Sequence, residues 1–278
     1  MKLATLRKGR LTVAVRVDEV EVVEIKGVPD VGALLLLDNW ELLARSADGE
    51  KRNLGAVDPG EWAPVVPNPS KIVCVGLNYA NHIREMGREL PEYPTLFAKY
   101  PEALIGAFDD LIVPTSVASA LDWEAELAVV VGKPARNVSV ANADEYIAGY
   151  SVINDVTMRD YQYRTPEWFQ GKTFERSAPF GPFLTTHDSY TLGTELSTVV
   201  DGETMQSTTT DDLVFGPAEL VSYISQIVTL NPGDVIASGT PGGVGHARKP
   251  PRYLVDGNTL TTRIDGLGAC VNLVRIEG

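Results

Sequence analysis

Residues Asp122-Trp-Glu-Ala-Glu-Leu-Ala-Val-Val-Val-Gly132 combine a charged start with an apolar run, a pattern typical of a strand that enters a protein core. We expect this strand at 124–131. Side chains two residues apart share one face of a strand, so Glu124 and Glu126 should point the same way. Two adjacent carboxylates beside a buried segment need protons, cationic partners or a metal ion. An exposed acidic edge is the alternative interpretation.

A third carboxylate follows the next predicted strand. The apolar residues of 150–154 predict a short strand, and Asp155 comes directly after it. Asp155 could form a turn or cap a helix. Beside Glu124 and Glu126, it would instead complete a set of three oxygen ligands. Because this set contains no cysteine or histidine, it favours a hard cation such as Mg²⁺ or Mn²⁺ over zinc.

The sequence around these strands predicts more strands than helices. Further short strands are expected at 71–75, 235–238, 259–264 and 269–276. The last two should form a hairpin joined by Asp265-Gly266. The strongest helix pattern covers 218–228, with Pro217 in the first helical position, and a shorter helix is expected at 142–146 with Asn142 as its cap. No regular strand–helix alternation occurs, which favours a mixed α/β domain with a mostly β core over a Rossmann sheet or a (β/α)₈ barrel.

The N-terminal part of the chain carries no cluster of chemically useful residues. Strand-like runs are expected at 11–15 and 20–25, and helix-like segments at 31–37 and 39–45. Four prolines then occur within 58–69, which excludes a helix or a central strand there. We interpret this stretch as a linker, with a small N-terminal domain at 1–66 and the main domain at 67–278.

Charge and hydropathy exclude several classes of protein. The 278 residues include 24 basic and 37 acidic side chains, for a formal net charge of −13. Such a chain lacks the basic face that binds nucleic acids or anionic membrane surfaces. Apolar runs such as 33–37 are far shorter than the roughly 20 residues of a spanning helix. We expect a cytoplasmic protein without nucleic-acid or membrane partners, with its two cysteines reduced.

Residues 78–87 predict a short helix or turn that brings two reactive side chains together. His82 and Glu85 are three residues apart and should share a helical face. A carboxylate beside an imidazole fixes its tautomer and raises its basicity, which would make His82 a general base for water. A surface ion pair is the alternative. Arg159 and Lys172 are candidate anion-holding residues.

The glycine-rich stretch 238–245 follows a predicted strand. Its exposed amides and the Thr240 hydroxyl could bind a carboxylate or a phosphate, although a flexible turn would have the same composition. It lacks the Gly-Lys-Ser/Thr ending of a P-loop. His187 and His246 fall in predicted loops and receive no role.

Four motifs together resemble the fumarylacetoacetate hydrolase family. They are Val73-Cys-Val-Gly-Leu-Asn-Tyr-Ala-Asn-His82, the quoted stretch 122–132, Gly149-Tyr-Ser-Val-Ile-Asn-Asp-Val-Thr-Met-Arg-Asp160 and Ser238-Gly-Thr-Pro-Gly-Gly-Val-Gly245. Their order and spacing also match, and the resemblance covers roughly 67–278. It implies an α+β fold, namely a mixed β-roll catalytic domain with a small N-terminal α/β annex, usually assembled as a homodimer.

The resemblance also implies roles for individual residues. The metal, Mg²⁺ or otherwise Mn²⁺ or Ca²⁺, would be held by Glu124, Glu126 and Asp155. The positions that match catalytic residues are His82, Glu85 and Lys172, with His82 and Glu85 on a lid. The positions that match substrate-binding residues are Arg159, Gln162, Lys99, Thr240 and Gly239.

From these motifs we expect a metal-dependent acylpyruvate hydrolase. It would cleave a C–C bond in a β-diketo acid such as fumarylpyruvate, in the catabolism of aromatic compounds. Decarboxylation of oxaloacetate and isomerisation of a hydroxydienedioate would use the same metal site and enolate chemistry. A non-catalytic metal-binding protein is the alternative from another class, and its expected mark, loss of His82, Glu85 or a ligand carboxylate, is absent from the sequence.

Overall fold

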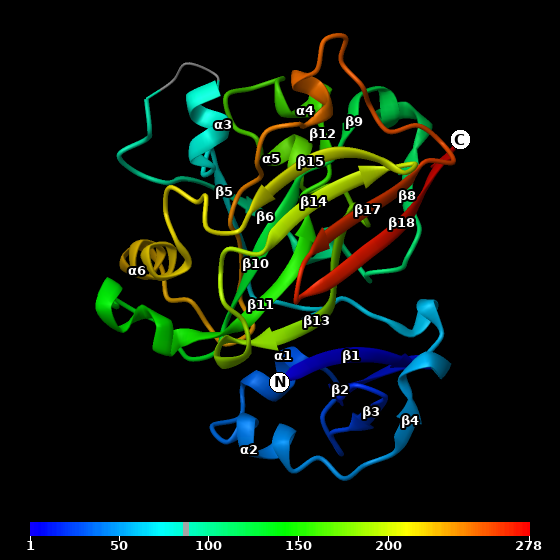
Figure 1. The fold of residues 1–278 in the computed structure, drawn as a ribbon, viewed down its shortest axis with the longest axis vertical. Coiled ribbons are helices and arrows are strands. Elements are labelled where there is room, and N and C mark those ends of the chain that lie inside the picture. The colour runs from blue at the N-terminus through cyan, green and yellow to red at the C-terminus, as the bar shows by residue number, and fades with distance from the viewer. Residues whose placement is uncertain (86–88) are drawn as a thin grey trace.

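The computed structural model describes residues 1–85 and 89–278. Within them a large mixed sheet runs through the whole molecule (Figure 1). Its strands, in spatial order, are β4 (Lys51–Asn53), β3 (Glu21–Glu24), β2 (Leu11–Val17), β1 (Lys2–Lys8), β13 (Ala178–Thr186), β11 (Ile147–Asn154), β10 (Ala125–Val131), β16 (Val235–Ala237), β5 (Ile72–Gly76) and β6 (Thr95–Lys99), with β7 (Leu104–Ile105) paired to β13.

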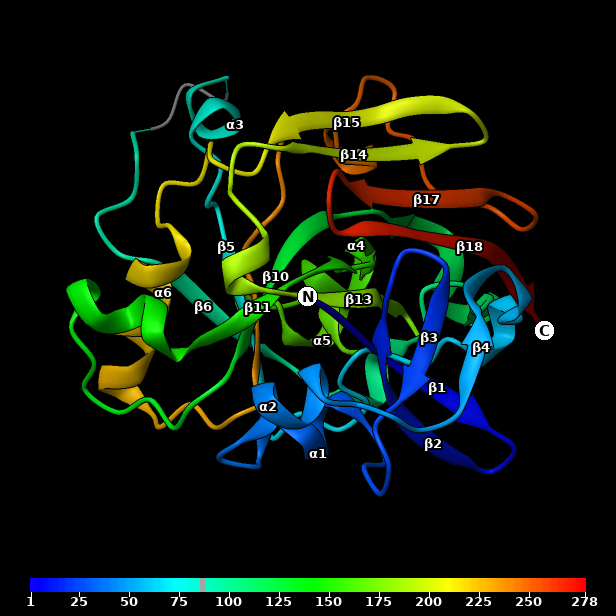
Figure 2. The ribbon, with the colours of Figure 1, turned by 60° about the horizontal axis from the view of Figure 1, so that its bottom comes forward.

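A second sheet packs over the middle of the first, as Figure 2 shows. It consists of β15 (Glu203–Thr209), β14 (Glu195–Val200), β17 (Thr259–Ile264), β18 (Gly268–Glu277) and β8 (Leu111–Pro114). A separate two-stranded antiparallel sheet is formed by β9 (Leu121–Asp122) and β12 (Thr157–Met158). The helices are α1 (Val31–Leu35), α2 (Trp40–Arg45), α3 (Ala80–Glu85), α4 (Arg159–Gln162), α5 (Phe169–Lys172) and α6 (Pro217–Ile227).

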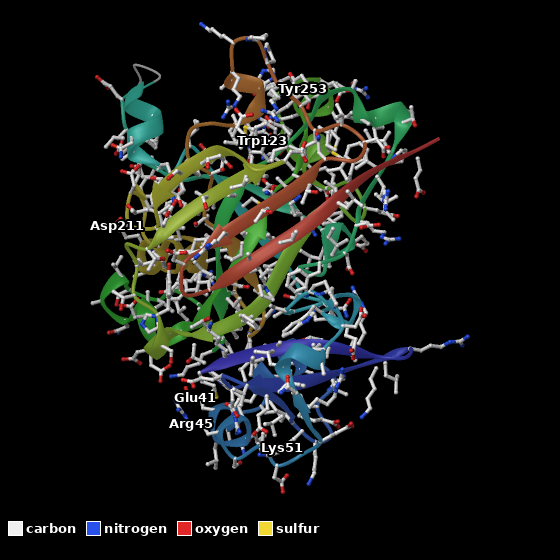
Figure 3. All side chains as sticks on the ribbon, turned by 45° about the vertical axis from the view of Figure 1, so that its right-hand side comes forward. Glu41, Arg45, Lys51, Trp123, Asp211 and Tyr253 are labelled. Atoms are coloured by element: carbon white, nitrogen blue, oxygen red, sulfur yellow. The ribbon has the colours of Figure 1, made fainter. Side chains whose placement is uncertain are left out.

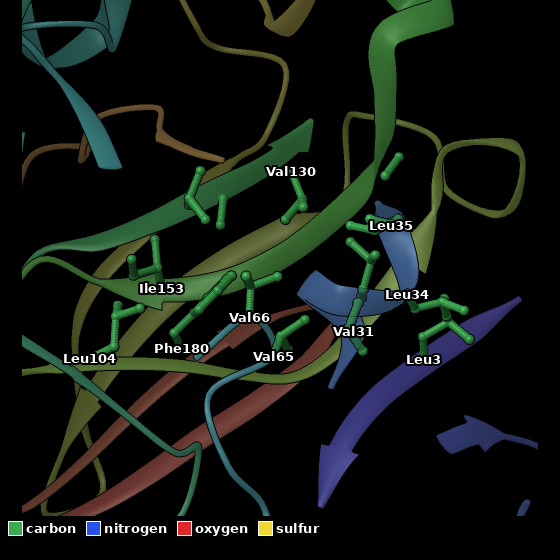
Figure 4. Packing of buried hydrophobic residues seen from close by; sticks show 14 of the residues in the cluster. Leu3, Val31, Leu34, Leu35, Val65, Val66, Leu104, Val130, Ile153 and Phe180 are labelled. Atoms are coloured by element: carbon green, nitrogen blue, oxygen red, sulfur yellow. The ribbon is translucent and has the colours of Figure 1, made fainter. Parts of the chain in front are cut away.

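Strands β10 and β11 are buried along their whole length because both of their faces meet apolar layers. On one face Val130 and Ile153 join Leu34 and Val65 from the N-terminal part of the chain, a packing shown in Figure 4. On the other face Val129 packs with residues of the second sheet. A strand buried on both faces needs an uninterrupted apolar sequence, which is what the run at 127–131 supplies.

Most of the predicted elements are confirmed. Both central strands, the 259–276 hairpin, the two N-terminal helices and α6 lie where the sequence placed them, within a few residues. The predicted helix at 142–146 is different. It is a 3₁₀ helix at Val140–Tyr146 that begins after Ser139, so Asn142 lies inside it and is not its cap. The pattern did not resolve the 3₁₀ geometry, in which hydrogen bonds connect residues three apart.

The N-terminal strands extend the main sheet and do not form a sheet of their own. β1 pairs antiparallel with β13, with Lys2 opposite Thr185 and Leu3 opposite Leu184. Residues 62–66 of the proline-rich stretch are buried, and Val65 contributes to the central core. The division at residue 66/67 stays a prediction, but the two parts share one core.

Thr5 connects β1 to the start of α1 and to the proline-rich stretch. Its buried hydroxyl donates to the Val65 carbonyl at 2.7 Å and accepts from the Val31 amide at 3.0 Å. A hydroxyl that serves two backbone groups away from water cannot be removed without leaving both of them unpaired.

We therefore predict that Thr5→Val lowers the free energy of unfolding by about 1–3 kcal/mol, measured by chemical denaturation. Thr12→Val, an isosteric change on the neighbouring half-buried strand β2, is the matched control and should change it by less than about 0.5 kcal/mol. Equal effects of the two changes would contradict this account of Thr5.

Candidate active site

The pairing of β10 with β11 brings the predicted carboxylates together. Ala125 lies opposite Asn154 in an antiparallel register, which places Glu124 next to Asp155. The Asp155 amide donates to the Glu124 carbonyl at 2.9 Å, and the Asn154 side chain accepts from the Glu124 amide at 2.9 Å. The two strand ends are therefore locked against each other where the side chains meet.

Glu124, Glu126 and Asp155 form a compact set of carboxylates. One ligand oxygen from each lies within 4.8 Å of the others, and the exposed fractions are 7%, 1% and 0%. The prediction that Glu124 and Glu126 share a face is confirmed, and the exposed acidic edge is excluded. A buried, all-oxygen set of this size suits a hard divalent cation.

Three buried cations surround this set. Lys172 Nζ lies 2.6 Å from Glu124 Oε2 and 2.8 Å from Asp155 Oδ2. Lys99 Nζ lies 2.8 Å from Asp155 Oδ1 and also donates to the Lys172 carbonyl. Arg159 Nη1 lies 2.7 Å from Glu124 Oε1. The structure thus brings together all three cations predicted from the sequence.

Glu126 is the carboxylate that these cations leave out. Among the described residues its hydrogen-bond donor is the Gly239 amide, at 2.8 Å from Oε2. Burial, together with Asp155 and Glu124, raises the pKa of Glu126 well above its usual range. Burial also raises the pKa of Asp155, but Lys172 and Lys99 outweigh it and the net pKa is lowered. A buried carboxylate without a cation beside two others fits a bound divalent ion, so the residues present match the expected metal.

Asp122 belongs to the candidate site, although sequence reasoning gave it no role. Its buried carboxylate accepts from Arg159 Nε at 2.8 Å and from the amides of Gly245 and His246 at 2.7 and 2.9 Å. Asp122 therefore ties the glycine-rich loop to the guanidinium beside the metal set. Its place two residues before Glu124 predicts that it shares the strand face with that residue. Its hydrogen-bond partners could not be predicted, because they are distant in sequence.

The glycine-rich loop lies over the carboxylates. Gly239 has a φ of 98°, and a Cβ there would come within 2.8 Å of the Val75 carbonyl, so only glycine fits. Thr240 accepts from Gln206 Nε2 at 2.8 Å. A flexible turn is excluded, because the loop is held by Glu126 at one end and by Asp122 at the other.

These elements surround a pocket of about 420 Å³. Its lining residues are Val75, Gly76, Leu77, Phe97, Glu124, Arg159, Gln162, Tyr163, Trp168, Lys172, Thr240, Val244, His246 and Ala247. The predicted Arg159, Gln162, Lys172 and Thr240 line it, and Lys99 lies behind Asp155. His82 and Glu85 belong to α3, but their side chains lie outside the described residues.

Sequence reasoning missed the aromatic wall and one histidine. Phe97 and Trp168 meet edge to face, with ring centroids 5.4 Å apart. Gly76 makes room for them, because a Cβ there would lie 2.3 Å from the Trp168 ring. His246, given no role from the sequence, lies in a 3₁₀ helix at Gly245–Ala247 and lines the pocket.

Comparison with known proteins identifies the family. Residues 71–275 match the family described as "Fumarylacetoacetate (FAA) hydrolase C-terminal". The chain therefore belongs to the fumarylacetoacetate hydrolase family, as its motifs predicted, and is an enzyme of that superfamily with its α+β fold. Among the described residues, none of the helices has the length and apolar character needed to cross a bilayer.

The chain is similar to several known proteins. The mitochondrial oxaloacetate tautomerase FAHD2A of Bos taurus is 43% identical over 216 residues, which cover 76% of this chain and 68% of that protein. A putative HpcE protein from Mycobacterium smegmatis has a TM-score of 0.89 at 33% identity, with 100% of both chains covered. Maleylpyruvate hydrolase from Sphingobium sp. SYK-6, in complex with manganese(II) and pyruvate, has a TM-score of 0.81 at 25% identity, also with 100% of both covered.

The different surroundings of Glu126 and Asp122 give a test of the ligand assignment. We predict that Glu126→Gln weakens Mn²⁺ binding at least about tenfold more than Asp122→Asn, as measured by metal titration. Glu126 is a ligand candidate that forms no ion pair within the described part of the chain, whereas Asp122 acts through Arg159 and the loop. Equal losses in the two variants would show that the ligands are misassigned.

Proposed function

We propose that the chain is a metal-dependent enzyme that acts on a 2-oxo acid through its enolate, and that it interconverts the enol and keto forms of oxaloacetate. The observation that carries this proposal is the buried carboxylate set, with Lys172 and Arg159 beside it, at the base of a pocket. The sequence identity with an oxaloacetate tautomerase supports the choice of reaction. The sequence alone led us to rank hydrolysis first.

Glu124, Glu126 and Asp155 would hold the divalent cation, which as a Lewis acid would stabilise the enolate form of the substrate. Arg159 is placed to bind the carboxylate of the same substrate. Its Nε and Nη1 are engaged by protein groups, whereas Nη2 is buried and has no hydrogen-bond partner among the described residues. The guanidinium lines the pocket, so Nη2 is the donor left for an anionic ligand.

Lys172 fixes positive charge beside the enolate. Burial lowers the pKa of Lys172, but Asp155 and Glu124 outweigh it, so the net pKa is raised and the ammonium group keeps its charge. A fixed cation in a site closed to water stabilises negative charge that develops during the reaction. Tautomerisation also needs a proton carrier between carbon and oxygen, and we assign this role to His82, oriented by Glu85.

Hydrolysis of an acylpyruvate such as fumarylpyruvate is the second candidate. The aromatic wall of Phe97 and Trp168 supports it, because it offers a planar apolar surface that a compact four-carbon acid does not need. In that reaction His82 would deprotonate a water that attacks the distal carbonyl, and the pyruvate enolate would leave. Decarboxylation and diene isomerisation would use the same base of the pocket. The homodimer and the cytoplasmic location stay predictions.

We predict that chelation abolishes the enol–keto conversion of oxaloacetate and that Mg²⁺ or Mn²⁺ restores it. The loss of enol absorbance measures this reaction, and acylpyruvate cleavage and carbon dioxide release are assayed in parallel. Rates far above those of the metal-reconstituted Glu126→Gln variant would identify the reaction that the site catalyses. Full activity after exhaustive chelation would contradict the metal assignment.

The role of His82 can be tested by its removal. If water activation limits hydrolysis, His82→Ala should lower kcat on an acylpyruvate by roughly 10²–10⁴-fold, the usual contribution of a general base. The affinity for oxalate, a mimic of the pyruvate enolate, should change much less. Oxaloacetate decarboxylation, which needs no attacking water, should suffer less than hydrolysis.

Asn81→Ala, an exposed change on the same helix, is the control for that experiment. Glu85→Gln should follow His82→Ala with a smaller loss. Intact acylpyruvate hydrolysis in His82→Ala would show that His82 is not the base. An equal loss of every activity would assign it instead to proton delivery at the enolate.

A further inference from the structure

The geometry points to His246 as the residue that recognises a second, distal carboxylate of the substrate. This inference rests on the proposed function and deepens it, because it names the residue that would distinguish a 2-oxo dicarboxylate such as oxaloacetate from a 2-oxo monocarboxylate. Four observations carry it: the position of His246, the fixation of its ring, the engagement of the other cations and the local charge.

His246 is held at a defined place relative to the metal set. Its amide donates to Asp122 at 2.9 Å, and the same carboxylate accepts from Arg159 Nε at 2.8 Å. A Cβ on the preceding Gly245 would lie 1.9 Å from the Arg252 carbonyl, so this loop packs without slack. Figure 3 shows neighbouring Trp123 and Tyr253 close together at the end of the molecule opposite the N-terminal sheet.

The imidazole is oriented by two tyrosines. Its Nδ1 lies 2.8 Å from the Tyr253 hydroxyl, and its ring stacks obliquely on Tyr163, with centroids 5.1 Å apart. Burial and the Asp122 charge raise the pKa of Tyr253, so this phenol keeps its proton at neutral pH. When the phenol donates to Nδ1, the neutral imidazole carries its own proton on Nε2. In that tautomer the His246 ring presents a hydrogen-bond donor to the pocket.

The other cations that line the pocket are committed to its base. Arg159 and Lys172 each contact Glu124, and Lys172 also contacts Asp155. His246 is exposed at the mouth, and none of the ion pairs among the described residues includes it. A substrate bound at the base by its oxo-acid end would therefore meet His246 with its other end.

The sequence around His246 has the opposite charge to the chain as a whole. Arg248, Lys249 and Arg252 follow within six residues, although the net charge is −13. Arg252 is paired with Glu203 at 2.6 Å, while Lys249 is exposed. Basic side chains in the segment that follows a binding residue raise the local concentration of an anionic ligand. A substrate whose distal end is a methyl group would gain no electrostatic attraction from these cations.

The test measures equilibrium binding to the Mn²⁺-loaded full chain by calorimetry. The probes are oxalate and two pairs of 2-oxo acids that differ in a distal carboxylate or methyl group: 2-oxoglutarate with 2-oxopentanoate, and 2-oxoadipate with 2-oxohexanoate. We expect the wild type to prefer at least one diacid. His246→Ala should weaken that diacid about 5- to 20-fold, and change oxalate and the monoacid by less than about twofold. The alanine variant keeps the backbone amide at position 246, which donates a hydrogen bond to Asp122.

Two further variants separate recognition from structure. Tyr253→Phe should lower the preference for the diacid in the same direction, because it releases the imidazole. His187→Ala, a histidine remote from this pocket, should leave the preference unchanged. Equal binding of diacid and monoacid by the wild type would overturn the inference, as would an equal loss of both in His246→Ala. Failure of oxalate and every oxo acid to bind the wild type would contradict the proposed function and this inference with it.

Discussion

The balance of buried charge at the base of the pocket constrains the rest of the structure. Moving an ion from water into a protein interior costs several kcal/mol, and partners recover that cost only at close range. Here four acids face three cations, and these groups come from four separate segments of the chain: Lys99, then Asp122, Glu124 and Glu126, then Asp155 and Arg159, and finally Lys172. The central strands must therefore keep one register, and α4 and α5 must dock at one position.

Asp122 extends this constraint from the base of the pocket to its mouth. One carboxylate accepts from a side chain beside the metal set and from two amides of the glycine-rich loop. A shift of the loop would remove two amide donors from Asp122, and a shift of Arg159 would remove one of the two cations that contact Glu124. Asp122 thus contacts both the guanidinium at the base of the pocket and the backbone at its mouth.

The metal set could be predicted from the sequence, because it depends on local rules. Strand alternation places Glu124 and Glu126 on one face, and Asp155 ends the neighbouring strand. The contacts of Lys99 could not be predicted from the residues alone, since it reaches Asp155 through the pairing of β5 with β6. The extension of the main sheet by β1 is equally non-local, because its partner Thr185 lies 183 residues further along the chain.

His246 was missed for a related reason. A histidine that follows a glycine-rich loop has no periodic pattern around it, and its role depends on Tyr163 and Asp122, which contact it only in the folded chain. Tautomerisation, decarboxylation and C–C hydrolysis of a 2-oxo acid all pass through an enolate, so the proposed chemistry at the base of the pocket suits each of them. The difference between those reactions must then arise where the substrate's other end lies. In this chain that region contains an aromatic wall and an oriented imidazole, so the proposed selectivity would be decided there.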